Sequence, residues 1–127
     1  MAQKVRILRT FVLAIGFCIL SAFAARADAT VSLLHTFGPL APYGAFPWST
    51  LIQGANGNFY GTAASGGQFG AGNIFQVTPS GILTVMYAFT NGIDGAYPRG
   101  ALVVGSDGSF YGTAAYGGSN GVGTVFK

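Results

Sequence analysis

The sequence predicts an all-β protein built from four-stranded antiparallel repeat units of about 51 residues, similar to the blades of a β-propeller. The first observation is an internal repeat, since residues 58–67 (NFYGTAASGG) return as residues 109–118 (SFYGTAAYGG), 51 positions later. The second is that each copy carries an Asn-Gly or Asp-Gly pair between two short β-prone runs, which is typical of a β-hairpin. The third is composition: 14% aromatic residues argue against disorder, and 21 glycines indicate many turns.

The first 27 residues predict a secretory signal peptide, expected as an N-terminal helix. A basic segment (residues 4–9) precedes an apolar run (residues 11–20), and small residues lead to a cleavage site between Ala27 and Asp28. The apolar run is shorter than the roughly 20 residues that a membrane span needs, so no stable span is expected after removal. The protein is therefore expected to be secreted, periplasmic or at the cell surface.

Removal of residues 1–27 changes the charge of the chain. Only Arg99 and Lys127 remain against three aspartates, which gives a net charge of −1 for residues 28–127. Nucleic-acid binding requires a clustered basic footprint, so this composition excludes it. Cys18 is the one cysteine and lies within residues 1–27, so no disulfide is expected in the exported domain.

The first repeat unit, residues 28–82, is expected to hold four strands. The run at residues 30–37 is apolar on both faces, which suits a strand buried between layers. Asn56-Gly57 predicts a tight turn, and residues 63–72 form a glycine-rich connection. The four strands are expected at residues 30–37, 49–53, 58–62 and 73–77.

The second unit, residues 83–127, follows the same order but is truncated in or after its last strand. Residues 44–76 and 95–127 align without a gap, and about half of the aligned positions are identical. The corresponding strands are expected at residues 82–89, 101–104, 109–113 and 124–126. Two blades cannot close a propeller. The chain is therefore expected to be either a fragment of a longer chain with further blades or a subunit of a ring that identical chains complete.

The repeated motif is expected to be structural. Adjacent Phe59 and Tyr60 point to opposite faces of a strand, so each can pack against a different neighbour. Gly61 is expected to admit a neighbouring backbone or to mark a bulge. The motif residues are Phe59, Tyr60, Gly61, Thr62, Gly66, Gly67 and Phe75 in the first copy, and Phe110, Tyr111, Gly112, Thr113, Gly117, Gly118 and Phe126 in the second.

These motifs resemble a bacterial secreted family, the Gloeo/Verruco-type extracellular tandem repeat. The resemblance covers residues 56–81 and 107–127, with upstream H-x-F and G-A-x-P elements at residues 35–37, 44–47 and 95–98. It implies tandem units of propeller-like β structure behind a signal peptide. It implies no reaction, because the family has no established activity to transfer to any residue.

No catalytic, metal or cofactor constellation is expected. The chain has no glutamate, and Asp94 and Asp107 both lie in turn-like sequences, so a glycosidase pair has little support. His35, the one histidine, is expected to be a hydrogen-bonded and partly buried core residue rather than a ligand or base. The protein is therefore interpreted as a non-enzyme.

One group of loop residues has a functional interpretation. Aromatic rings in or beside loops can stack on sugars, and Arg99 stands at the repeat position of Trp48, although packing between blades explains the same rings. The candidate ligand-binding residues are Tyr43, Trp48, Tyr97, Arg99 and Tyr116. The sequence favours an exported, non-catalytic structural or binding module for a glycan or protein ligand. The alternatives are a lectin-like module completed by oligomerisation and a fragment of a larger secreted propeller enzyme.

Overall fold

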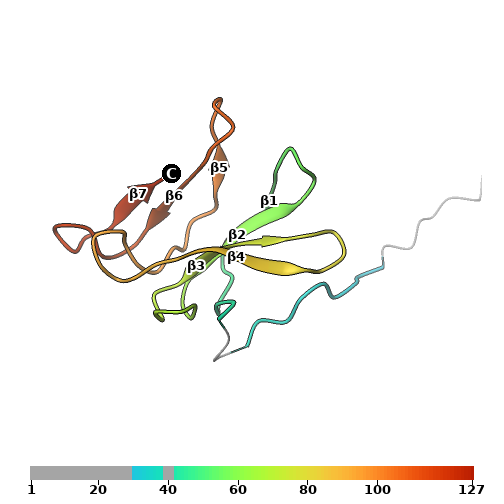
Figure 1. Ribbon diagram of the computed structural model, residues 1–127, viewed down its shortest axis with the longest axis horizontal. Coiled ribbons are helices and arrows are strands. Elements are labelled where there is room, and N and C mark those ends of the chain that lie inside the picture. The colour runs from blue at the N-terminus through green and yellow to red at the C-terminus, as the bar shows by residue number, and fades with distance from the viewer. Residues whose placement is uncertain (1–29, 39–41) are drawn as a thin grey trace, which may run out of the picture. The chain divides into compact units, whose positions relative to one another are not determined.

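The computed structural model describes residues 30–38 and 42–127 (Figure 1). The chain divides into two units, Met1–Ser32 and Leu33–Lys127, and the architecture below is that of the second. The expected signal helix and the cleavage site at Ala27 and Asp28 lie outside the described residues. All regular structure in the described part is β-strand, which confirms the all-β class. None of the described residues belongs to a helix long and apolar enough to cross a membrane.

Four strands form the first sheet, in the order β1-β2-β3-β4 and antiparallel throughout (Figure 1). They are β1 (Ile52–Gln53), β2 (Phe59–Ala63), β3 (Asn73–Val77) and β4 (Leu83–Ala88). The side chain of Asn56 accepts a hydrogen bond from the backbone N–H of Asn58 at 3.2 Å, which closes the expected turn between β1 and β2.

The second sheet has three strands in the order β5-β6-β7. They are β5 (Val103–Val104), β6 (Phe110–Ala114) and β7 (Thr124–Phe126). Asp107 closes the β5–β6 turn as Asn56 does in the first copy, by accepting a hydrogen bond from the Ser109 N–H at 3.0 Å. This confirms the structural role expected for that aspartate.

The grouping of strands differs from the expectation in one respect. The run at residues 82–89, expected to start the second unit, instead forms β4 and pairs with β3 of the first sheet. Its counterpart at residues 30–37 is not a strand, which corrects the prediction. The physical reason is that a strand needs a hydrogen-bonded neighbour. β4 has β3 as its neighbour, whereas no strand within the described residues pairs with residues 30–37.

Gly61 and its counterpart Gly112 face aromatic side chains, not a neighbouring backbone, so that expectation was wrong. Gly61 pairs with Phe75 across β2 and β3, and Gly112 pairs with Phe126 across β6 and β7. The irregularity in the first sheet lies between Ile74 and Phe75 on β3. Phe75 joins Ala63 and Val77 in a buried cluster on which Phe37, Phe59 and Leu83 pack.

The two sheets contact each other through the repeated motif. The ring of Tyr60 on β2 lies 4.4 Å from that of Phe110 on β6, measured between centroids. The Thr62 hydroxyl donates a hydrogen bond to the Gly100 carbonyl oxygen at 3.2 Å. A second buried cluster (Ala71, Phe89, Ala96 and Ala114) draws on both repeats. Residues of the repeated motif therefore contribute to the contact between the two sheets.

Candidate binding surfaces

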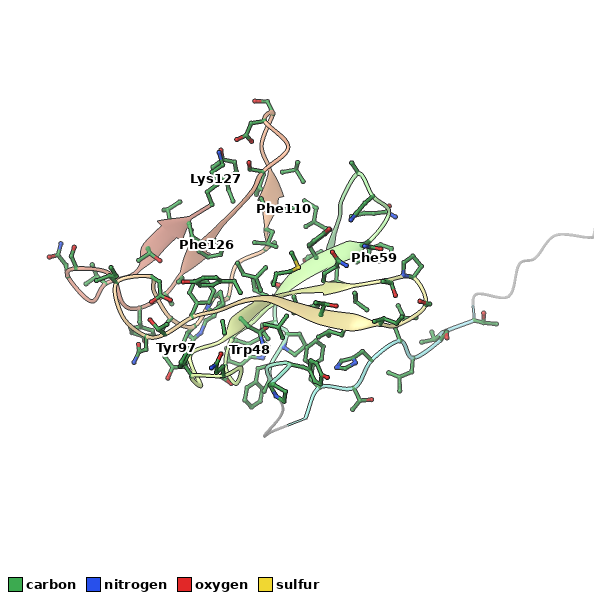
Figure 2. The ribbon with its side chains drawn as sticks, in the orientation of Figure 1. Trp48, Phe59, Tyr97, Phe110, Phe126 and Lys127 are labelled. Atoms are coloured by element: carbon green, nitrogen blue, oxygen red, sulfur yellow. The ribbon has the colours of Figure 1, made fainter. Side chains whose placement is uncertain are left out.

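The five candidate ligand-binding residues fall into three separate groups. Tyr97 and Tyr116 contact each other, Trp48 contacts Arg99, and Tyr43 contacts His35. Within the described residues, no aromatic or cation–π contact joins one group to another. Figure 2 shows Trp48 and Tyr97 on the loops that precede β1 and β5.

An open hollow surrounds the tyrosine pair. Its volume is about 630 Å³ and it opens to solvent. The Tyr97 and Tyr116 rings stand nearly perpendicular, at 86° with centroids 5.7 Å apart, and Tyr116 is 52% exposed. The wall residues Asn91, Ile93 and Ser119 were not among the expected site residues, and only their position in loops could have indicated them. We call this feature the tyrosine hollow; it is lined by Asn91, Gly92, Ile93, Tyr97, Tyr116, Gly117, Gly118, Ser119 and Gly121.

Two loops are tied together to build the tyrosine hollow. Ala96 and Tyr116 exchange backbone hydrogen bonds of 2.8 and 3.1 Å, and the Gly118 N–H donates to the Gly92 carbonyl at 3.0 Å. Asn91 and Tyr97 have φ angles of 63° and 54°, in the left-handed region that non-glycine residues seldom occupy. Such strain persists only where surrounding contacts impose it, so the direction in which the Tyr97 side chain leaves the backbone is fixed.

Asp94 stands in the loop beside the tyrosine hollow, with its carboxylate already engaged. It accepts hydrogen bonds from the Thr90 hydroxyl and backbone N–H, and from the Tyr87 hydroxyl at 3.0 Å. The Thr90 hydroxyl is the main reason that the pKa of Asp94 falls to about 2. The hydrogen bond that the Tyr87 hydroxyl donates to Asp94 raises the pKa of Tyr87 above its ordinary value. At neutral pH Asp94 is therefore an ionised acceptor that orders the loop.

Asp107 is also a stabilised anion. Lys127 lies 2.8 Å from its carboxylate, and the Tyr111 hydroxyl donates to it at 3.0 Å. Lys127, with the Ser109 backbone N–H and Tyr111, lowers the pKa of Asp107 to about 2. A glycosidase acid requires a raised pKa, so neither aspartate has the environment of that role. Within residues 30–38 and 42–127 no cluster of three or more His, Cys, Asp or Glu could hold a metal ion.

The second group pairs the two residues that share a repeat position. The Arg99 guanidinium lies 5.2 Å from the centre of the Trp48 ring, a cation–π contact between the two repeats. Phe46 flanks Trp48, with ring centroids 5.8 Å apart, and both side chains are more than half exposed. Sequence alignment places Trp48 and Arg99 in equivalent loops and gives no sign that they touch.

The third group contains Tyr43 and His35, whose rings lie 5.8 Å apart. His35 also meets Phe37 edge-on at 5.0 Å. Its Nε2 atom is buried and has no hydrogen-bond partner within the described residues, which contradicts the expectation of a satisfied core histidine. The reason is that its neighbours are aromatic rings, which offer no strong acceptor or donor at that atom.

The repeated sequence matches a known protein family. The family model of the Gloeobacter/Verrucomicrobia repeat matches residues 21–127. The chain belongs to this repeat family. The match spans both copies of the motif, and with it both loops of the tyrosine hollow and the Trp48–Arg99 contact. A search of curated proteins finds no match to this Gloeobacter/Verrucomicrobia repeat chain.

Proposed function

We propose that this Gloeobacter/Verrucomicrobia repeat chain is an exported, non-catalytic, propeller-like module that binds a ligand in the tyrosine hollow. The observation that carries the proposal is the Tyr97–Tyr116 pair: two perpendicular rings, one half exposed, set in an open hollow by strained backbone. Aromatic rings fixed in this way lose little conformational entropy on binding, which favours recognition of a flat or apolar surface.

Export is proposed from the leader-like pattern of residues 1–27, with release at the cell surface, into the periplasm or outside the cell. The non-catalytic role is supported by the two engaged aspartates, whose pKa values near 2 leave neither as a proton donor at neutral pH. Nothing in this proposal requires a cofactor or a metal ion.

A saccharide is the ligand class we favour for the tyrosine hollow. The half-exposed ring of Tyr116 can stack on a sugar ring, while neighbouring loop atoms and the Ser119 hydroxyl can hydrogen-bond to sugar hydroxyl groups. The lining residues carry no charged side chain, and the ionised Asp94 stands beside the hollow, so a neutral sugar is favoured over an anionic one.

The test is glycan-array screening of the secreted protein, followed by calorimetric titration with any saccharide that binds. Tyr116→Ala should weaken binding about tenfold or more, because loss of one stacking ring removes on the order of 1.4 kcal/mol. Tyr43→Ala is the matched control, since Tyr43 is an exposed tyrosine outside the hollow. Equal affinity for wild type and Tyr116→Ala would contradict the assignment of the hollow.

Trp48 offers a second readout, because it is the single tryptophan of the chain and is largely exposed. Quenching of its fluorescence by a saccharide would place the ligand at the Trp48–Arg99 contact. A saccharide that binds without changing Trp48 emission, and loses affinity in Tyr116→Ala, supports the tyrosine hollow.

A further inference from the structure

The two repeats of the chain meet through unlike faces. Tyr97 of the second repeat donates its backbone N–H to the Ala71 carbonyl oxygen of the first at 2.8 Å. The Thr62 hydroxyl of the first repeat donates to the Gly100 carbonyl of the second at 3.2 Å. We call the contributing surface of the first repeat a back face, consisting of Tyr60, Thr62, Ala64 and Ala71. We call the contributing surface of the second repeat a front face, consisting of Tyr97, Pro98 and Leu102.

Because the sequence repeats, each face occurs twice, and its second occurrence lies open to solvent. Val122 stands where the first repeat has Ala71, and it is 83% exposed against 2% for Ala71. Leu51 stands where the second repeat has Leu102, and it is 45% exposed against 3%. The open back face consists of Tyr111, Thr113, Ala115 and Val122, and the open front face consists of Phe46, Pro47 and Leu51.

The open front face has the backbone conformation of the occupied one. Phe46 has a φ angle of 57°, and its counterpart Tyr97 has 54°. In Tyr97 this strained conformation aims the N–H at the Ala71 carbonyl. The Phe46 N–H has no backbone acceptor among the described residues, so the strain is present without the hydrogen bond that accompanies it in the second repeat. The carbonyl equivalent to that of Ala71 belongs to Val122.

The segment at residues 33–37 is also held in a repeated arrangement. Phe37 packs on Phe75 with centroids 5.1 Å apart at 61°, and Phe89 packs on Phe126 at 5.1 Å and 60°. Phe89 directly follows β4, the strand that covers the edge of β3. Residues 33–36 therefore stand where a β4-like strand would stand, without a strand to pair with.

The matching acceptor is β7. It corresponds to β3, and it lies at the edge of the three-stranded sheet with no strand on its outer side within residues 30–38 and 42–127 (Figure 1). An open edge strand readily accepts another strand. In the first sheet, Ile74 on β3 pairs with Tyr87 on β4. Val125 is the counterpart of Ile74 and His35 is the counterpart of Tyr87, so the same register places Val125 opposite His35.

We propose that copies of this chain associate head to tail, with the open front face of one copy on the open back face of the next. In the same contact, residues 33–36 of the first copy add a fourth strand to β7 of the second. A second copy is the occupant because each open face is the counterpart of a face that is already paired inside the chain, and the same chain supplies both. An interface between unlike faces generates a ring if its rotation closes, and four to eight blades correspond to two, three or four copies.

The first test is the mass of the secreted protein, produced from the full 127-residue sequence and measured by light scattering after size exclusion. A discrete species of two to four copies is expected. Val122→Arg should convert it to a folded monomer, because the new charge lies where the equivalent Ala71 is buried between repeats, while residue 122 is exposed in the single copy. Ile82→Arg is the control, because Ile82 is also an exposed apolar residue, at 65%, and belongs to neither face.

The second test fixes the register by disulfide capture in a Cys18→Ser background. Chains carrying only His35→Cys are mixed with chains carrying only Val125→Cys and are oxidised gently. Directly opposed residues lie about 4.5–5.5 Å apart between Cα atoms, within reach of a disulfide, so a mixed dimer should form in high yield. Thr36→Cys with Val125→Cys is the control, since adjacent strand residues point to opposite faces and should cross-link poorly.

A monomeric wild-type protein would overturn the proposal and leave the two open faces to further repeats of a longer protein. An oligomer that Val122→Arg does not dissociate, or equal cross-linking of the His35 and Thr36 variants, would also overturn it. Discrete mass, dissociation by Val122→Arg and register-selective cross-linking together support it.

Discussion

The ring of Phe75 lies over Gly61, its partner across β2 and β3. A Cβ atom added to Gly61 would stand 2.9 Å from Cζ of Phe75 and 2.7 Å from Cδ2 of Leu51. The second copy repeats the arrangement with Phe126 over Gly112 (Figure 2, where Phe126 is labelled on β7). In both sheets an aromatic ring thus occupies the space that the missing side chain leaves.

We therefore predict that Gly61→Ala destabilises the first sheet by about 1–3 kcal/mol, the usual cost of overpacking. Chemical denaturation measures the change in unfolding free energy. In the Phe75→Leu background the same substitution should cost clearly less, because the smaller side chain leaves room for the new methyl group. Equal costs in both backgrounds would show that the ring does not set the requirement for glycine.

A second prediction concerns Thr62, which connects the two repeats. Its hydroxyl and backbone bond the Ser49 hydroxyl at 3.0 and 3.2 Å, and its hydroxyl also reaches the Gly100 carbonyl. Thr62→Val should cost about 1–2 kcal/mol, since it removes the hydroxyl from a buried hydrogen-bonded group. Thr113→Val, at the exposed counterpart position, should change stability by less than about 0.5 kcal/mol. Both are measured in the Val122→Arg background, so that association between copies does not contribute.

Asn73 leads to a third, stabilising prediction. It is fully buried on β3, and neither its side-chain oxygen nor its nitrogen has a hydrogen-bond partner within the described residues. Its counterpart Thr124 donates to the Asp94 carbonyl oxygen at 3.1 Å. In Asn73→Thr, the new hydroxyl should donate to the Tyr43 carbonyl oxygen, which is the counterpart of the Asp94 carbonyl. The substitution also removes an unsatisfied buried amide, which costs about 1–3 kcal/mol.

Thermal unfolding should show a melting temperature several degrees higher for Asn73→Thr than for wild type. Asn73→Ala, which removes the amide without adding a hydroxyl, should fall between the wild type and Asn73→Thr. A lower melting temperature for Asn73→Thr would mean that the amide is satisfied in solution.

The fourth prediction follows from the two low carboxyl pKa values. Asp94 and Asp107 each titrate near 2 when folded, below the ordinary value of 3.8. Both are therefore stabilising while ionised, and that contribution is present above about pH 4 and is lost as the pH falls toward 2. Asp94→Asn and Asp107→Asn should each flatten the acid limb of a stability–pH curve. Salt should weaken the Asp107 contribution more, because its main partner is the charged Lys127, whereas that of Asp94 is the neutral Thr90 hydroxyl. An unchanged acid limb in both variants would contradict this account.

The sequence determines the local elements well and their assembly poorly. The bounds expected for the strands at residues 73–77 and 124–126 agree with β3 and β7, because turn glycines and alternating apolar residues mark short strands. Residues 30–37 have equally strong β propensity but form no strand, since pairing depends on a neighbour that propensity does not reveal.

The candidate site shows the same division. The loop position of Tyr97 and Tyr116 could be inferred from turn residues, but their perpendicular contact could not. It depends on the bridge between Ala96 and Tyr116 and on the left-handed backbone of Tyr97, which no local pattern specifies. The Trp48–Arg99 contact joins two repeats, so a comparison that superimposes the repeats hides it.

The last prediction tests the frame of the tyrosine hollow with two glycines of similar backbone conformation. Gly117 and Gly121 have φ angles of 77° and 73°, so alanine at either position incurs about 1 kcal/mol of left-handed strain. A Cβ on Gly117 would also stand 2.7 Å from the Gly92 carbonyl oxygen and from the Gly95 Cα, whereas a Cβ on Gly121 meets nothing within 4 Å. Gly117→Ala should therefore force the two loops apart and destabilise the protein by more than Gly121→Ala.

Hydrogen exchange measures this opening directly. The Gly118 amide, which donates to Gly92, and the Tyr116 amide, which donates to Ala96, should lose protection in Gly117→Ala and keep it in Gly121→Ala. Saccharide affinity should fall in parallel with that protection if the hollow holds the ligand. Equal protection of these amides in the two variants would mean that contact between the loops does not depend on the missing side chain at residue 117.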